Sequence, residues 1–206
     1  MHESVRQDSL TVDEYLKSEE EREVRHEYVR GQIFAMTGAT EDHNIIAGNL
    51  YGRLFQLLEG SNCRAYINDM KVRIEATDSF YYPDIMVTCE PIVGKSVFKS
   101  APIIIIEVLS PSTKHIDRRE KLVAYRTLES LQQYILVHQD RCLIEVYTRK
   151  SAKEWLVAML QMPQHLVLNI SPELQPKIAV ADIYDKIDPQ FFVKEPEEEY
   201  IVRSSS

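Results

Sequence analysis

Two acidic residues stand at the ends of apolar stretches that are typical of buried strands. Glu107 follows four isoleucines within residues 101–110, and Asp84 follows a proline at the start of the run 82–87. A carboxylate inside an apolar run is costly to desolvate unless a cation, a metal or several hydrogen-bond donors meet it. If the two strands are neighbours, both carboxylates reach one hard cation. Because Mg²⁺ takes one or two carboxylates and keeps several waters, the pair predicts Mg²⁺ or Mn²⁺ rather than zinc.

Lys121 is the third candidate for chemistry. It follows Asp117 by four residues, which on a helix is the favourable order for a surface ion pair worth about 0.3–0.5 kcal/mol. Alternatively, the helix that follows Glu107 carries Lys121 back to the two carboxylates, with Tyr125 on the same side. A lysine at that place can stabilise a phosphate during its transfer. The sequence leaves both interpretations open.

Both acids also have ordinary structural interpretations. Glu107 can lie at the exposed C-terminal end of its strand, just before Ser110-Pro111, and Pro83-Asp84 can be a turn. Open α/β sheets, however, bind ligands at the C-terminal ends of their strands. The structural and the functional interpretation therefore place Glu107 at the same edge of the sheet.

Other polar residues have weaker claims. Glu27 lies on a predicted hairpin strand, where its simplest role is to face a base across the strands. His43 falls in the first turn of a predicted helix, either as an ordinary polar residue or as a contact for a phosphate or a water. Four further histidines share no metal-ligand spacing and receive no role: His26, His115, His138 and His165.

The elements that position these residues begin with a helix and a hairpin. Thr11 and Glu14 form a capping box at the start of a short helix. Arg30-Gly31 fits a two-residue turn between two strands. These strands are expected at residues 24–29 and 32–37. Thr40 caps a second helix, which Gly60 ends. Its apolar positions at helical spacing are Ile46, Leu50, Leu54 and Leu57.

The rest of the chain alternates strands with helices. Strands are expected at residues 63–67, 70–75, 82–88, within 101–110, and at 134–137, 143–147 and 155–159. Helices are expected at residues 117–128 and 180–186, and a loop is expected at residues 95–100. The passage from the isoleucine strand through a helix to the next strand implies parallel pairing with a crossover helix. We expect an α/β fold with a mixed α+β sheet, in a single domain over residues 1–190. An acidic tail over residues 191–206 is expected to be disordered.

Composition bounds the function. The net charge of −8 over 206 residues argues against a surface for indiscriminate binding of a polyanion. Bases nevertheless outnumber acids near the candidate site. Residues 114–126 hold two acids, Asp117 and Glu120, and five bases: Lys114, Arg118, Arg119, Lys121 and Arg126. The three cysteines lack CxxC spacing and are expected to pack as small apolar groups rather than to bind zinc or form bridges. Without a membrane span or a signal peptide, a cytoplasmic protein is expected.

The order of these motifs resembles the Uma2 family, restriction-endonuclease-like proteins within the PD-(D/E)XK nuclease superfamily. The resemblance covers about residues 11–188. The residues that carry it are Arg25 to Gln32, Glu41 to Leu50, Pro83-Asp84, Glu107 to Thr113, Asp117, Lys121, Tyr125 and Gln133 to Val137. It implies a restriction endonuclease-like core with the N-terminal helix and hairpin as an elaboration.

The resemblance also implies roles for the site residues. Asp84 and Glu107 would bind the metal together with the backbone carbonyl of Val108, and Glu27 would be an accessory acid. The superfamily pattern has a lysine two residues after the second acid, where this chain has Leu109. By the resemblance, Lys121 supplies the relocated lysine.

The function that follows is a Mg²⁺- or Mn²⁺-dependent endonuclease that hydrolyses phosphodiester bonds in DNA. Lys114, Arg118 and Arg119 would contact the DNA backbone, and cleavage of both strands would require a homodimer. Two alternatives remain. One is a catalytically inactive nuclease-fold protein that binds nucleic acid or a protein partner, and the other is a metal-stabilised structural domain. The net charge favours these alternatives, whereas the combination of Asp84, Glu107 and Lys121 favours the enzyme.

Overall fold

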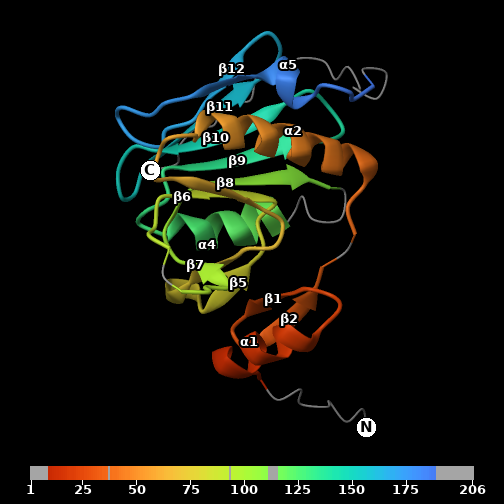
Figure 1. Cartoon of the computed structure of the whole chain (residues 1–206), viewed down its shortest axis with the longest axis vertical. Helices are drawn as coiled ribbons and strands as arrows, with labels where there is room; N and C mark the ends of the chain where they lie inside the picture. The colour runs from red at the N-terminus through yellow and green to blue at the C-terminus, as the bar shows by residue number, and fades with distance from the viewer. Residues whose placement is uncertain (1–8, 37, 93, 111–115, 189–206) are drawn as a thin grey trace, which may run out of the picture.

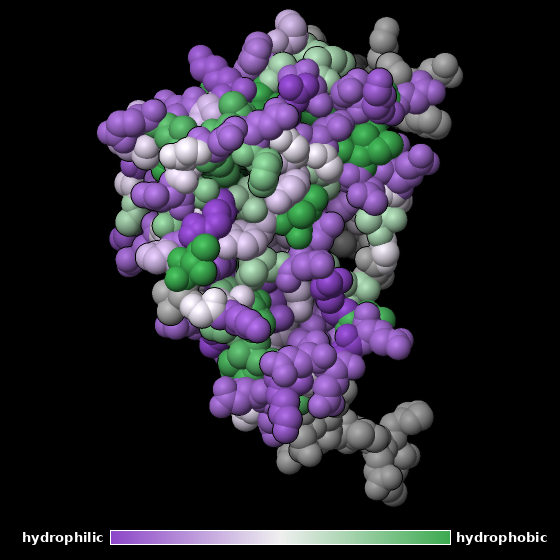
Figure 2. Space-filling model, viewed as in Figure 1, coloured by the Kyte–Doolittle hydropathy of each residue, from purple (hydrophilic) through white to green (hydrophobic). Residues whose placement is uncertain are grey.

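The computed structural model describes residues 9–36, 38–92, 94–110 and 116–188. They form three β-sheets with a few helices, which confirms the predicted mixed α+β architecture (Figure 1). The predicted tail, 191–206, and Lys114 lie outside the described residues. No helix in the described ranges is long and apolar enough to span a bilayer. The face drawn in Figure 2 is mainly hydrophilic, with its hydrophobic side chains in small separate groups.

The six-stranded sheet carries the site, with strand order β11-β10-β9-β8-β6-β3. Its strands are β3 (Arg64–Ile67), β6 (Ile85–Thr88), β8 (Pro102–Leu109), β9 (Gln133–His138), β10 (Ile144–Arg149) and β11 (Trp155–Leu160). Between β8 and β9 the chain forms a π-helical turn, η2 (Asp117–Lys121), and the helix α4 (Leu122–Arg126). β8 and β9 pair in parallel, as predicted for a strand–helix–strand passage.

Helices cover both faces of this sheet, which explains why β8 has no polar face. Ile104, Ile106 and Val108 pack in a core with α2 (Glu41–Leu57). Ile105 and Leu109 pack on the opposite face with residues of α4 (Figure 1). Side chains alternate along a strand, so Glu107 points to the α4 face.

The helix α2 begins and packs as its sequence predicts, apart from its last turn. The Thr40 hydroxyl accepts a hydrogen bond from the backbone N–H of His43, at 3.2 Å. Ile46, Leu50 and Leu54 are fully buried, as expected. The prediction for Leu57 is wrong: it is 36% exposed, and Leu58, just past the end of the helix, is 5% exposed in its place. Leu58 follows Leu54 by four residues and its N–H donates to the carbonyl of Leu54 at 3.0 Å, so Leu58 and not Leu57 continues the buried stripe.

The five-stranded sheet, in the order β2-β1-β5-β4-β7, lies on the α4 side of the larger sheet (Figure 1). Its strands are β1 (His26–Val29), β2 (Gln32–Ala35), β4 (Lys71–Ile74), β5 (Ser79–Tyr81) and β7 (Phe98–Lys99). The β1–β2 turn has positive φ at Arg30 (50°) and Gly31 (84°), as a tight hairpin requires. The sequence did not predict β5, and residues 95–100 were expected as a loop, although Phe98–Lys99 pair with β4. Strands of two or three residues are too short to show an alternating pattern.

The N-terminal helix supports this sheet. α1 (Val12–Glu21) has the expected capping box between Thr11 and Glu14. Its Tyr15 is fully buried against Tyr28 and Phe80, with ring centroids 5.1 and 5.3 Å away. These three aromatic rings join the helix, β1 and β5 into one core.

The C-terminal part holds two strands that the sequence did not predict, β12 (His165–Val167) and β13 (Lys177–Ala179). The expected terminal helix is shorter than predicted and is α5 (Val180–Ile183). Leu166, Ile178 and Ile183 are buried in the core shared with α2. This segment therefore completes the face of the large sheet that α2 covers.

The expectation for the cysteines is wrong for two of the three. Cys63 and Cys89 form a disulfide. β3 and β6 are antiparallel, and Arg64 lies opposite Thr88. The same register continued by one residue places the two cysteines opposite each other. Among the described residues, Cys142 is the cysteine that forms no disulfide.

Candidate active site

Asp84 and Glu107 meet because β6 and β8 are antiparallel neighbours. Ile85 lies opposite Ile106, so the residue before β6 faces the residue near the end of β8. The N–H of Asp84 donates to Oε2 of Glu107 at 3.2 Å, and the N–H of Val108 donates to Oδ2 of Asp84 at 2.7 Å. Each carboxylate thus accepts a hydrogen bond from the other strand, which fixes both at the same edge of the sheet.

Glu107 is almost fully enclosed. Its side chain is 4% exposed, and its Oε1 accepts hydrogen bonds from the Tyr125 hydroxyl at 3.1 Å and from Lys121 Nζ at 3.3 Å. Burial raises the pKa of Glu107 well above its ordinary value. The nearby Lys121 ammonium opposes this rise, while the Asp117, Asp84 and Glu27 carboxylates add to it. Ionisation of this acid is therefore more costly here than in water.

Lys121 lies at the centre of the acidic groups. Its Nζ is 2.9 Å from Oε1 of Glu27 and 3.3 Å from both Oε1 of Glu107 and Oδ1 of Asp117. The predicted pair with Asp117 forms, but it is buried rather than on the surface. Burial lowers the pKa of Lys121, but the three carboxylates outweigh burial and raise it well above its ordinary value. Lys121 therefore stays protonated and can act as a fixed positive charge, not as a general base.

The π-helical turn brings Asp117 and Lys121 to the site. In η2 the chain makes a wider turn than an α-helix, a feature often found at functional sites. The hydroxyl of Tyr134, on β9, donates to the backbone carbonyl of Asp117 at 3.0 Å. This bond holds the turn against the sheet, so that both side chains point toward Glu107.

His43 reaches the same group from the opposite face. It lies in the first turn of α2, and its Nε2 is 3.1 Å from Oδ2 of Asp84. Burial lowers the pKa of His43, but the hydrogen bond and negative charge of Asp84, with Asp117 and the Val108 backbone, raise it overall. The structure thus brings together all five of the predicted catalytic residues: Glu27, His43, Asp84, Glu107 and Lys121.

The charge of this group suits a hard cation. Four carboxylates, Glu27, Asp84, Glu107 and Asp117, surround one lysine and one histidine, so negative charge is in excess. Oδ1 of Asp117 is buried and makes no hydrogen bond beyond its 3.3 Å ion pair with Lys121. Within the described ranges, no three His, Cys, Asp or Glu side chains are placed to hold a metal. Asp84 and Glu107 supply two carboxylates at one edge of the sheet, so the residues fit a cation such as Mg²⁺, which needs one or two carboxylates and keeps its waters.

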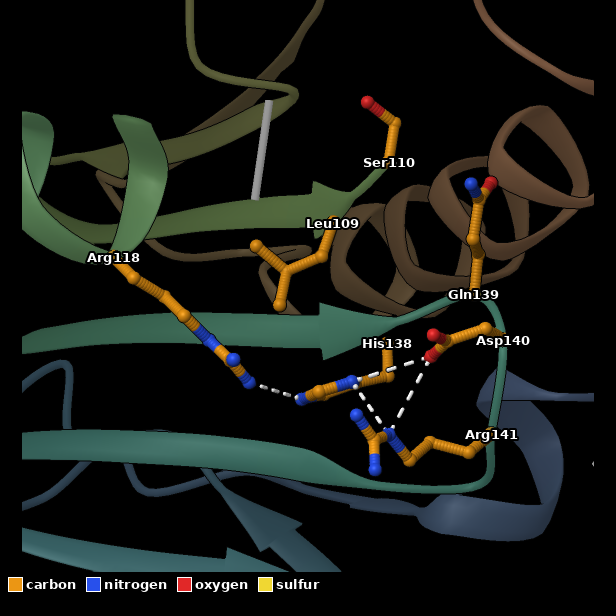
Figure 3. A pocket seen from close by; sticks show the side chains of 7 residues that line it. All are labelled: Leu109, Ser110, Arg118, His138, Gln139, Asp140 and Arg141. Carbon is orange, nitrogen blue, oxygen red and sulfur yellow. Dashed lines mark hydrogen bonds and ion pairs between the residues drawn. The ribbon is translucent and has the colours of Figure 1, made fainter. Parts of the chain in front are cut away.

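The predicted DNA-binding residues are placed differently from one another. Arg119 is exposed. Arg118 instead turns toward β9 and β10, where its Nη2 lies 2.9 Å from Nε2 of His138 and donates to Oε1 of Glu145. Figure 3 shows Arg118 and His138 at a cavity of about 50 Å³ beyond the end of β8. Because Arg118 is already paired with a buried carboxylate, only part of its charge is available to a polyanion.

Sequence reasoning missed the partners of Arg118. His138 is 3% exposed and lies 2.8 Å from Glu145, which is 4% exposed. Burial raises the pKa of Glu145, but His138 and Arg118 outweigh it and lower the pKa overall. These residues come from η2, β9 and β10, so no spacing in the sequence could have grouped them. An acid inside the apolar strand 143–147 was the one feature that singled out Glu145.

Comparisons with known proteins identify the family of the chain. The family model Uma2, described as "Putative restriction endonuclease", matches residues 12–181. Two proteins of Synechocystis sp. (strain ATCC 27184 / PCC 6803 / Kazusa), "Uncharacterized protein slr1290" and "Uncharacterized protein sll1609", are similar over most of their length. The first is 36% identical over 160 residues, covering 77% of this chain and 84% of the relative. The second is 34% identical over 155 residues, covering 73% and 87%.

A solved structure shares the fold. It is the crystal structure of "a putative nuclease belonging to DUF820" from Anabaena variabilis ATCC 29413, with a TM-score of 0.68 and 20% sequence identity. The match covers 85% of this chain and 97% of that chain. At this identity the likeness speaks for the fold alone, and it agrees with the predicted restriction endonuclease-like core. With the family model matched from the first helix to the last, the chain belongs to the Uma2 family.

Proposed function

We propose that this protein is a metal-dependent endonuclease that hydrolyses phosphodiester bonds in DNA. The observation that carries the proposal is the position of Lys121, a buried and protonated lysine 3.3 Å from Glu107 in the acidic group at the edge of the sheet. A lysine that only neutralised surface acids would not need this burial. The family description as a restriction endonuclease supports the same class of reaction.

The proposed metal is Mg²⁺ or Mn²⁺. Asp84 and Glu107, with the backbone carbonyl of Val108, would hold it, because they supply hard oxygen ligands at one edge of the sheet. Bound there, the ion would polarise a phosphate oxygen and lower the pKa of a water. It would also offset the excess of carboxylates and favour the ionised form of Glu107.

The chain's own residues would then divide the work. Lys121 would keep a positive charge beside the scissile phosphate, in place of the lysine that Leu109 replaces. His43 would orient Asp84 through its 3.1 Å contact, and its raised pKa would let it donate a proton or a hydrogen bond to the phosphate. Glu27 would hold Lys121 in place at 2.9 Å.

The substrate and the assembly are further parts of the proposal. The DNA backbone would be contacted by Lys114, Arg118 and Arg119. Arg118 would contribute less than the other two, because Glu145 already neutralises part of its charge. Cleavage of both strands would use two copies of the chain. A cytoplasmic location is also proposed, although disulfides such as Cys63–Cys89 are rare in that compartment.

The second candidate is a catalytically inactive nuclease-fold protein that binds nucleic acid or a protein partner. The specific observation in its favour is Leu109, an apolar residue where the superfamily has its lysine, together with the net charge of −8. Such a protein would bind DNA or its partner equally well with and without the acidic group.

Plasmid nicking with added Mg²⁺ or Mn²⁺ tests the proposal. The wild type is compared with Asp84→Asn and with Lys121→Met, which keeps the length of the side chain but removes its charge. The matched control is Lys99→Met, because Lys99 is equally buried (7% exposed) but pairs with Glu90. We expect nicking by the wild type and the control and a loss of about 100-fold or more in the two site variants. Equal nicking by all four proteins would contradict the proposal.

A further inference from the structure

The edge strand β11 is unusual in its composition. Its six residues, Trp155 to Leu160, include no charged residue, no proline and no glycine. Leu156, Val157 and Met159 are 53%, 45% and 55% exposed. Figure 1 shows β11 beyond β10 at the end of the six-stranded sheet, and no described strand pairs with its outer edge.

The other edges in the described sheets are better protected. β2 and β3 have four residues each, β12 and β13 three, and β7 two, so β11 is the longest edge strand. Proteins usually guard such edges with charges, prolines or short strands, because unpaired N–H and C=O groups are a template for another strand. β11 has none of these protections.

The backbone groups that face outward can be identified from the neighbouring bonds. The N–H of Arg149 donates to the carbonyl of Gln132, on the β9 side, while the N–H of Lys150 donates to the carbonyl of Glu154 in the hairpin. Even-numbered residues of β10 therefore bond to β11. Thr148 pairs with Leu156 and Val146 with Ala158, so the even-numbered residues of β11 form the bonds to β10. The backbone N–H and C=O groups of the odd-numbered residues of β11 therefore point away from β10.

We propose that two copies of this chain pair through β11 in an antiparallel, two-fold symmetric manner. Trp155, Val157 and Met159 present their N–H and C=O groups to the second copy. Symmetry requires an outward residue opposite an outward residue, and a two-fold axis at Val157 meets this condition. It places Trp155 opposite Met159 of the second copy and Val157 opposite its own equivalent, with about six hydrogen bonds in all.

The charges around β11 agree with a second copy as the partner. In this register Lys153 lies opposite Gln161 of the second copy, and Glu154 lies opposite Leu160. No like charges oppose each other, although the chain as a whole carries −8. The uncharged strand is thus a place where two acidic chains can approach without repulsion, and its exposed apolar side chains lose contact with water. The inference specifies how the two copies named in the nuclease proposal would pair, and its test is independent of nuclease activity.

Sedimentation velocity over a range of protein concentrations tests this inference. Val157→Pro removes the N–H at the two-fold axis without removing a bond to β10, and proline is tolerated on edge strands. The control Val157→Thr keeps both the N–H and the β-branched shape. We expect a dimer in the wild type and in Val157→Thr. Dimerisation of Val157→Pro should be about 10- to 30-fold weaker, because two hydrogen bonds at the axis are lost.

Hydrogen exchange supplies a second readout, and circular dichroism verifies that the proline variant folds. In the dimer, the amide of Val157 should exchange slowly at high protein concentration and quickly on dilution. A wild type that stays monomeric at all concentrations would overturn the inference. So would a folded Val157→Pro variant that dimerises as tightly as the wild type, or a Val157 amide protected equally in the monomer.

Discussion

The backbone N–H of Asp84 donates a 3.2 Å hydrogen bond to Oε2 of Glu107, so the backbone joins two acids whose charges repel each other. The reciprocal bond, from Val108 N–H to Oδ2 of Asp84, is 2.7 Å long. Two carboxylates therefore complete the pairing of β6 and β8 where regular strand structure ends. This double role means that substitutions should keep the size of the side chain, as asparagine and glutamine do.

The first prediction concerns Glu107 and pH in the metal-free protein. Because burial raises its pKa above the unfolded value, the folded state binds its proton more tightly than the unfolded state does. The contribution of Glu107 to the free energy of unfolding is therefore greatest below its unfolded pKa and falls as pH rises toward the folded pKa. Urea denaturation with EDTA, from about pH 5 to about pH 8, should show Glu107→Gln gaining stability relative to the wild type as pH rises.

The matched control for Glu107→Gln is Glu19→Gln, since the Glu19 side chain is 3% exposed but pairs with His26, away from Lys121. Added Mg²⁺ should reduce the difference between wild type and Glu107→Gln, because a bound cation favours the ionised carboxylate. A Glu107→Gln variant that loses stability relative to the wild type as pH rises in EDTA would contradict the raised pKa.

The second prediction concerns the stability that Lys121 provides. Lys121→Met leaves the Glu27, Glu107 and Asp117 carboxylates buried without their cation, and should lower the free energy of unfolding by about 3–5 kcal/mol near neutral pH. Lys99→Met should cost less, since Lys99 is equally buried but lies 3.9 Å from one carboxylate. Chemical denaturation of both variants measures the costs, and equal costs would show that Lys121 does not balance the acidic group.

The third prediction concerns His43. Since the hydrogen bond and charge of Asp84 raise its pKa against the effect of burial, Asp84→Asn should move the titration midpoint of His43 downward. NMR of the imidazole nitrogens, with the His43 signal assigned by a His43→Gln variant, follows this midpoint. Asp182→Asn, a change at a surface acid on α5, is the control and should leave it in place. A midpoint that stays constant or rises in Asp84→Asn would rule out the contact.

The fourth prediction concerns Thr40, which links the start of α2 to Gln139 at the cavity beyond the end of β8. Its hydroxyl accepts from the N–H of His43 at 3.2 Å and donates to Oε1 of Gln139 at 2.7 Å. Thr40→Ala should lower the free energy of unfolding by about 1 kcal/mol and reduce nicking by displacing His43. Thr40→Ser keeps the hydroxyl and should preserve both. If Thr40→Ala matches the wild type in both measurements, the cap does not position His43.

Much of the fold could be predicted because the decisive patterns are local. The capping residues Thr11 and Thr40 start their helices as expected, and Arg30-Gly31 makes the predicted turn. The apolar run around Glu107 indicated a strand covered on both faces, and the order strand–helix–strand indicated its parallel pairing. The caps, the turn and the apolar run each lie within a few positions, and the strand–helix–strand order needs only consecutive elements.

What escaped prediction depends on contacts between distant segments. The disulfide of Cys63 and Cys89 follows from the register of β3 and β6, which no local pattern reveals. The short strands β5 and β7 exist because longer strands beside them supply the pairing. Arg118 turned inward because Glu145 and His138, from other strands, offered a buried partner. The candidate site itself was predictable as a set of residues, whereas the π-helical turn that assembles Asp117 and Lys121 was not.

The most direct measurement is the anomalous diffraction of a crystal soaked in Mn²⁺, with a Glu107→Gln crystal as the control. We predict one strong peak at about 2.0–2.3 Å from carboxylate oxygens of both Asp84 and Glu107, absent in the control. A wild-type crystal with no peak there, or with the same peak in Glu107→Gln, would contradict the proposed metal site.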